Sequence, residues 1–202
     1  MLESRKIFLV DAMLEYFSNL SPISNGFIKE VKNNSHAMLV RKNKYILSPL
    51  DQNVSVYFVV NGLVRGFIKE DHKDITTWIS VGNEFIGAIQ APSQSISPSI
   101  EYLQALEDTE LVAIPNAAIQ MLYDLYSETN IIGRKILALQ YHAACERSIL
   151  ARIPSAERRY EKFLELNSFD ISNVPLRCLA SFLGMRLETL SRIRSKLIKE
   201  LN

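Results

Sequence analysis

The spacing of hydrophobic residues changes along the chain and divides it into three parts. Residues 3–20 place large apolar side chains three or four positions apart, which predicts an amphipathic helix. A turn-rich segment follows, and a short helix is expected around Gly26–Lys32. From about residue 37 the spacing changes to two, and after Pro115 it returns to a helical period.

Short segments rich in Val, Ile and aromatic residues fill the part with period two, and such segments are typical of strands. The expected strands lie within Tyr45–Leu47, Val54–Val60, Leu63–Ile68, Ile75–Val81 and Leu103–Ile114. Asn61-Gly62 predicts a tight hairpin because both residues tolerate positive φ, and Asp71–Asp74 predicts a second turn. Ile89–Ser99 is expected to be a loop. This pattern indicates an antiparallel sandwich or jelly roll.

The part after Pro115 is expected to be helical. The predicted helices are Asn116–Leu125, Asn130–Arg152, Ser155–Leu166, Pro175–Leu183 and Leu187–Leu201. Ile153-Pro154-Ser155 interrupts the helical pattern, because a proline followed by a serine cap starts a new helix. We therefore expect an α+β protein with a barrel at 1–129, a long helix at 130–153 and an all-helical domain at 154–202.

The long helix has too many apolar residues for one face. One stripe consists of Ile132, Ile136, Leu139, Ala143 and Leu150, and a second of Leu137, Tyr141 and Ala144. One stripe can pack on the barrel, and the other then needs a partner, most simply the same helix of a second chain. We expect a homodimer with the first stripe at its interface. A helix fully buried inside a monomer is the alternative.

The segment LASFLGMRLETLSRIRSKL, Leu179–Leu197, has the spacing of a helix-turn-helix. Ala180 is small enough for two helices to cross, and Gly184 supplies the tight turn. The apolar residues that fill the angle between the helices are Leu179, Leu183, Met185, Leu190, Ile193 and Leu197. A plain helical hairpin of an interaction domain would show a similar pattern.

The outer face of the last helix carries groups that suit the major groove. Arginine donates two hydrogen bonds to guanine, and glutamate accepts one from the cytosine amino group. Lysines, including Lys199, and hydroxyls suit phosphates. The expected DNA-binding residues are Arg186, Leu187, Glu188, Thr189, Ser191, Arg192, Ser195 and Lys196.

The charge distribution agrees with a polyanionic partner. The whole chain carries +1, whereas residues 151–202 hold ten Lys/Arg and six Asp/Glu and carry +4. No run of eighteen apolar residues exists and the N-terminus lacks the pattern of a secretion signal, so we expect a cytoplasmic protein without a membrane span. Cys145 and Cys178 are isolated, and form neither a CxxC pair nor a metal cluster.

Together these features resemble the Crp/Fnr family of bacterial transcription regulators. The segments that carry the resemblance are YFVVNGLVRGF (Tyr57–Phe67), VGNEFIG (Val81–Gly87), ALEDTELVAIP (Ala105–Pro115) and the segment Leu179–Leu197. The resemblance implies a cyclic-nucleotide-binding-like jelly roll, a homodimer built on the long helix and a pseudo-palindromic site in double-stranded DNA. We expect RNA polymerase as a further partner.

The sequence departs from the cyclic-AMP-binding members at the expected effector pocket. Those members hold the ribose with a glutamate after a glycine and the phosphate with an Arg-Ser pair. Here Ala88 follows Gly87, and the positions of the Arg-Ser pair fall on Ser99 and Ile100. Without the arginine the charge-assisted hydrogen bonds to phosphate are missing, so we expect no high-affinity cyclic AMP binding. The cysteine cluster of oxygen-sensing members is also missing, so we expect no iron–sulfur cluster.

The DNA-reading end departs as well. The family often reads with Arg-Glu, three residues and Arg; Glu188 and Arg192 match, and Leu187 replaces the first arginine. Leu187 either contacts a thymine methyl group or packs on the turn. The sequence ends at Asn202, where many members continue into a β wing, so we expect a DNA-binding domain without a wing.

Two other classes of function compete with a transcription regulator. The first is an effector-binding or protein-interaction module of the same fold that does not bind DNA. The second is an enzyme, such as a metal-dependent barrel enzyme, which needs clustered ligands. His36, His72 and His142 are scattered, and no nucleophile with a base or phosphate-binding loop is visible. We therefore expect no catalytic activity.

Overall fold

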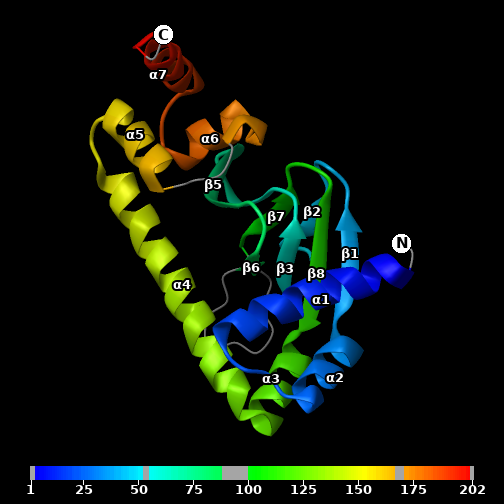
Figure 1. Ribbon diagram of the computed structural model, residues 1–202. Coiled ribbons are helices and arrows are strands. Elements are labelled where there is room, and N and C mark those ends of the chain that lie inside the picture. Colours follow the sequence, from blue (N-terminus) through cyan, green and yellow to red (C-terminus); the bar gives the residue numbers. More distant parts are fainter. Residues whose placement is uncertain (1–2, 52–54, 88–99, 167–170, 201–202) are drawn as a thin grey trace.

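The computed structural model describes residues 3–51, 55–87, 100–166 and 171–200, with side chains up to residue 197 (Figure 1). The strands are β1 (His36–Val40), β2 (Tyr45–Leu47), β3 (Ser55–Asn61), β4 (Val64–Glu70), β5 (Lys73–Ser80), β6 (Glu84–Ile86), β7 (Tyr102–Ala105) and β8 (Thr109–Pro115). The α-helices are α1 (Glu3–Leu20), α2 (Asn25–Asn34), α3 (Asn116–Leu125), α4 (Ser127–Arg152), α5 (Ala156–Leu166), α6 (Leu176–Phe182) and α7 (Leu187–Glu200). The predicted helices are confirmed, with ends that match or shift by up to three residues.

The strands form two antiparallel four-stranded sheets, as the alternating pattern predicted. The first sheet has the order β1-β8-β3-β6, and the second has the order β2-β7-β4-β5. Most neighbours come from distant parts of the sequence, and β8, for example, lies between β1 and β3. The exception is the hairpin of β4 and β5. This crossing order makes the two sheets one jelly-roll barrel, in which β6 and β5 are edge strands.

The hairpin predicted at Asn61-Gly62 is wrong, because β3 and β4 belong to different sheets. The dipeptide forms a corner at which the chain crosses from one sheet to the other. Gly62 has a φ of 120°, and a Cβ placed on it would lie 2.5 Å from Thr109 Oγ1. Glycine is therefore needed here for close approach as well as for its backbone angle. The turn predicted at Asp71–Asp74 is confirmed: it joins β4 to β5 with positive φ at Asp71 and His72.

Side chains of the first sheet alternate between two apolar cores. One core lies between the sheet and helices α1 to α4, and its strand residues are Phe58, Phe85, Val112 and Ile114. The other lies inside the barrel and combines residues of both sheets, among them Tyr57, Val59, Leu111, Val64 and Leu103. Because alternate residues of a strand face opposite sides, β3 and β8 are covered on both faces.

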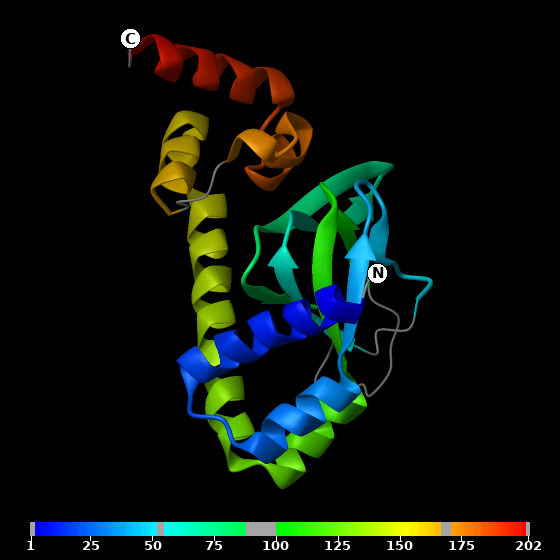
Figure 2. The ribbon, with the colours of Figure 1, turned by 45° about the vertical axis from the view of Figure 1, so that its right-hand side comes forward.

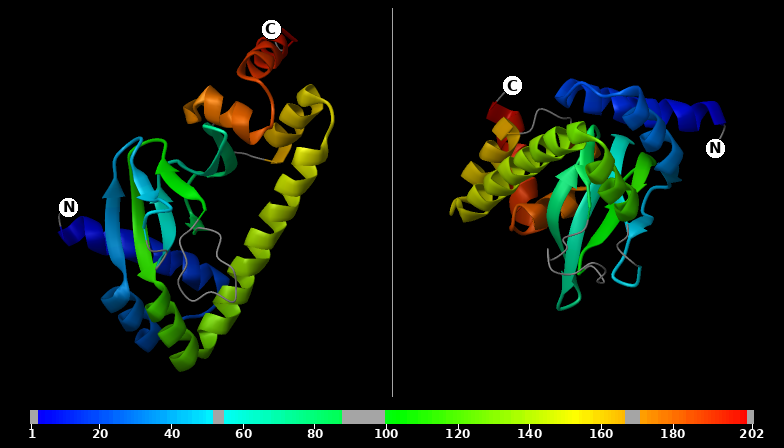
Figure 3. Two further views of the ribbon diagram at one scale, coloured as in Figure 1. Left: turned by 180° about the vertical axis from the view of Figure 1, so that it is seen from behind. Right: turned by 90° about the horizontal axis from the view of Figure 1, so that it is seen from below.

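Helix α4 connects the barrel to the C-terminal helices. It runs along one side of the molecule, with α1, α2 and α3 around its first half and α5 at its far end (Figure 2). Figure 3 shows from behind that α5, α6 and α7 gather beyond one end of the barrel, with α6 next to β5. A third apolar core joins these helices to barrel residues Leu63 and Leu106.

Candidate nucleic-acid interface

The connection between α6 and α7 is a tight turn centred on Gly184. The Gly184 amide donates to the Ser181 carbonyl at 3.1 Å, and the Met185 amide donates to the Ala180 carbonyl at 3.0 Å. Gly184 has a φ of 59°, in the left-handed region that glycine tolerates. These two hydrogen bonds form a Schellman motif, which ends α6 and redirects the chain. The predicted role of Gly184 is confirmed.

Apolar side chains fill the angle between α6 and α7 and pack both helices on α5. Ala180 is buried, and Leu190 on α7 is fully buried. Met185 and Leu197 are half-buried. The other buried members are Tyr160, Phe163, Val174, Cys178, Leu179, Leu183 and Ile193. The predicted filling of the helix-turn-helix is therefore present, and α7 has one side fixed to the domain.

The other side of α7 is polar and faces outward. Thr189 is half-buried, and the remaining predicted contact residues are exposed: Arg186, Leu187, Glu188, Ser191, Arg192, Ser195 and Lys196. Leu187 is the first residue of α7 and is 40% exposed, so its side chain is accessible to a ligand. The side chain of Lys199 lies outside the described residues.

The exposed polar groups differ in their partners. In the described part of the chain, Arg186 and Arg192 form no ion pair. The Ser195 hydroxyl donates to the Ser191 carbonyl within α7 at 3.0 Å. Lys196 Nζ lies 2.7 Å from a carboxylate oxygen of Glu157 on α5. The two arginines are thus the cations of this face that need no rearrangement to meet a ligand.

Comparison with solved structures shows a similar overall fold. FixK2 from Bradyrhizobium japonicum superposes with a TM-score of 0.68 at 20% identity, over 82% of this chain and 85% of FixK2. The c-di-GMP-responsive regulator CLP of Xanthomonas campestris gives 0.67 at 18% identity, over 88% and 93%. A Eubacterium rectale protein described as a Crp/Fnr transcriptional regulator gives 0.67 at 19% identity, over 90% and 88%. The chain has the Crp/Fnr regulator fold. No protein-family model and no curated protein matches the sequence.

Within this Crp/Fnr fold, α4 presents the two predicted stripes to different surroundings. Ile132 and Leu150 of the first stripe are buried in the apolar cores of their own chain. Ile136 packs beside Ile132, whereas Leu139 and Ala143 line a cavity. The second stripe faces outward: Leu137 is 66% exposed, Tyr141 is 73% exposed and Ala144 is also exposed. Of the first stripe, Ile132 and Leu150 are therefore not accessible to a second chain, whereas Leu139 is 53% exposed.

The residues predicted to form an effector pocket lie only partly in the described chain. Ala88 and Ser99 are outside it, Ile100 is 70% exposed, and Gly87 borders a cavity of about 660 Å³. This cavity lies between the end of the barrel and the C-terminal helices. Its walls come from β5 and β6, from the second half of α4, and from Phe163, Leu166 and Phe182 of α5 and α6.

The cavity carries charged groups among its apolar walls. Desolvation by the surrounding protein raises the pKa of Glu84, and the positive charge of the nearby Arg147 partly offsets this effect. Burial lowers the pKa of Arg147, while Glu84, Glu101 and Glu146 act in the opposite direction. The Gln140 side chain on α4 donates to the Phe85 carbonyl on β6 at 3.0 Å. The cavity thus has acidic and basic groups in reach of a bound molecule.

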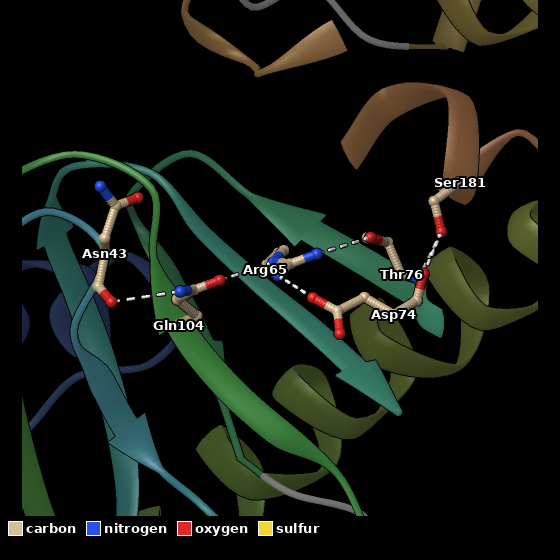
Figure 4. Close-up of polar contacts among 6 residues, drawn as sticks. All are labelled: Asn43, Arg65, Asp74, Thr76, Gln104 and Ser181. Atoms are coloured by element: carbon tan, nitrogen blue, oxygen red, sulfur yellow. Dashed lines mark hydrogen bonds and ion pairs between the residues drawn. The ribbon is translucent and has the colours of Figure 1, made fainter. Parts of the chain in front are cut away.

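A polar contact joins the helix-turn-helix to the barrel edge (Figure 4). The Ser181 hydroxyl donates to the Asp74 carbonyl at 2.9 Å and accepts from the Thr76 amide at 3.0 Å. Under this contact lies the buried Arg65, which donates to the Asp74 carboxylate at 2.6 Å and to Gln104 at 2.8 Å. Edge strand β5, whose outer backbone groups would otherwise lack partners, is therefore covered by α6.

Sequence reasoning missed this contact. Ser181 and Asp74 are 107 residues apart, and a serine inside a helix has no pattern that indicates a distant partner. Arg65 was a usable signal, because an arginine inside an apolar strand predicts a buried counterion. In the described residues no group of His, Cys, Asp and Glu is arranged to hold a metal ion, and no helix is long and apolar enough to cross a bilayer.

Proposed function

We propose that the protein is a homodimeric, sequence-specific DNA-binding transcription regulator without catalytic activity. The observation that carries this proposal is the exposed polar face of α7, which follows a well-formed turn and is fixed by a buried opposite side. A rigid helix with outward Arg and Glu side chains suits the major groove. The similar fold of regulators such as CLP supports the same function.

Within this proposal the side chains of α7 have separate roles. Arg192, which forms no ion pair in the described part of the chain, would donate to a guanine, and Glu188 would accept from a cytosine amino group. The exposed Leu187 would contact a thymine methyl group. The operator of this protein would then differ from that of a regulator with an arginine at the position of Leu187.

A homodimer would bury the outward stripe of α4. Two exposed apolar side chains, Leu137 and Tyr141, lie one helical turn apart, and Ala144 extends the stripe. Pairing this stripe with its copy around a two-fold axis would place the two α7 helices symmetrically, as a pseudo-palindromic site requires.

An effector of this regulator would bind in the cavity of about 660 Å³ beside Gly87. Its walls include barrel, α4 and C-terminal helices, so a bound molecule would favour one arrangement of these parts. Neither cyclic AMP nor an iron–sulfur cluster is part of the proposal, because the phosphate arginine and the cysteine cluster are missing from the sequence. The regulator would act in the cytoplasm, and RNA polymerase would be a further partner.

The deciding experiment is selection of bound fragments from genomic DNA, followed by affinity measurements at several salt concentrations. We expect enrichment of a pseudo-palindromic sequence and an affinity that falls steeply with salt. Absence of binding to any fragment at low salt would instead favour an effector-binding or protein-interaction module of the same fold.

A further inference from the structure

Of the residues on the outer face of α7, Lys196 is held by a carboxylate from another helix. Its Nζ lies 2.7 Å from Glu157 Oε1 on α5, and the two side chains are 56% and 38% exposed. The residues are 39 positions apart in the sequence. The contact is therefore a tertiary ion pair that links α5 to the exposed side of α7.

Glu157 differs in this respect from the other paired acids of α5. Glu161 pairs with Arg158, and Glu165 pairs with Lys162, in both cases three residues earlier in the same helix. Those pairs neutralise charge within α5. Glu157 instead places a negative charge beside the face that the proposed function assigns to DNA.

Lys196 stands where a phosphate contact is expected. It lies one helical turn after Arg192, on the same exposed side of α7. A lysine that meets phosphate releases counterions and adds affinity without reading the sequence. When Glu157 forms its ion pair with Lys196, a phosphate must displace the carboxylate to reach the ammonium group. The displaced carboxylate remains close and repels the DNA backbone.

We propose that Glu157 attenuates the sequence-independent part of DNA binding. By competing with phosphate for Lys196, it weakens the contact that is equal for all sequences and so lowers the affinity for every duplex by a similar factor. This inference rests on the proposed function. Because the pair is exposed, it contributes little to folding, and its effect belongs to DNA binding.

The test compares Glu157→Gln with Glu165→Gln, which removes an equally charged side chain two turns further along α5. Affinity is measured for the selected site and for an unrelated duplex between 50 and 200 mM salt, two concentrations that span a large change in protein–DNA affinity. We expect Glu157→Gln to tighten binding to both duplexes by about 3- to 10-fold at low salt and to steepen the salt dependence by about 0.9 in log–log slope. Glu165→Gln should leave the slope unchanged.

A double-mutant cycle separates competition for Lys196 from a general charge effect. In the background of Lys196→Gln, the change Glu157→Gln should lose most of its influence on affinity and slope. Equal melting temperatures of all variants would show that folding is unaffected. If wild type binds DNA and Glu157→Gln has the same slope, or acts equally without Lys196, the inference is overturned alone. Absence of DNA binding by every variant would overturn the proposed function as well.

Discussion

At the scale of single residues, the outer face of α7 combines free and compensated charges. Arg192 and Arg186 form no ion pair in the described chain, whereas Lys196 is paired with Glu157. An unpaired guanidinium group can donate two hydrogen bonds to the edge of guanine. The ammonium group of Lys196 suits a phosphate, which must compete with Glu157 for it. Under the proposed function, base reading and backbone contact would therefore fall to chemically different side chains.

Replacing Arg192 tests the base-reading assignment. Arg192→Ala should weaken binding to the selected site by about 1–3 kcal/mol and relax specificity at one base pair, because a bidentate contact is lost. The measurement is a set of titrations against the site and its single-base variants. Equal weakening on every duplex would make Arg192 a phosphate contact instead.

Glu84 in the cavity should make stability depend on pH. Its pKa is raised, chiefly because the surrounding protein desolvates the carboxylate, so the charged form is disfavoured in the folded state. The penalty is present at neutral pH and disappears as pH falls through the raised pKa. Glu84→Gln should therefore raise the melting temperature modestly at pH 7 and less at pH 5. Thermal unfolding at both pH values checks this, and a larger gain at pH 5 would contradict it.

At the scale of elements, periodicity predicted where helices and strands lie but not what covers them. The long helix was visible because its apolar residues recur, and its two stripes were visible as well. Which stripe faces the barrel depends on tertiary packing, and Ile132 of the first stripe lies in the core between the first sheet and the helices. The sequence pattern at Asn61-Gly62 likewise shows that positive φ is tolerated but cannot tell a hairpin from a corner between sheets.

The outward stripe of α4 should control self-association. Replacing Leu137 and Tyr141 together by Glu should convert a dimer into a monomer, because two charges would be buried in an apolar contact. Light scattering over a concentration series measures the mass. Ala138→Glu, at an exposed position about 100° around the same helix from Leu137, is the matched control and should matter less. Unchanged association of the double variant would remove this stripe from the interface.

The contact of α6 with β5 should stabilise the junction between barrel and C-terminal helices. Ser181→Ala removes one donor and one acceptor and leaves the Thr76 amide without that partner, which should cost about 1 kcal/mol. Denaturant unfolding measures the free energy, and amide exchange at Thr76 reports the contact directly. The hydroxyl of Ser195 donates within α7, so Ser195→Ala should change neither the contribution of this contact to the free energy of unfolding nor the amide exchange at Thr76.

At the scale of the whole molecule, the barrel and the helix-turn-helix share an apolar core. Leu63 and Leu106 from the barrel and Leu150 from α4 pack with the side chains that hold α6 and α7. The helix-turn-helix itself was predictable because its turn and core are local in sequence. The shared core and the cavity beside it were not, because their residues come from segments more than forty positions apart.

A fragment of residues 154–202 should therefore be poorly folded. It would lack the three leucines from outside the domain, and a segment of this size buries little apolar surface by itself. We expect weak helical circular dichroism and no cooperative melting, in contrast to the full chain. A sharp thermal transition of the isolated fragment would show that the shared core is dispensable.

The hydrogen bonds of Ser181 to β5 also bear on how such proteins diversify. A DNA-reading unit transplanted onto another barrel would meet a foreign edge strand and foreign leucines, and would lose both its polar and its apolar attachment. Exchange of the unit between relatives would thus succeed only with β5 and the corner at Leu63 included. Under the proposed function, operator preference would then change more readily through substitutions on the open side of α7 than through domain exchange.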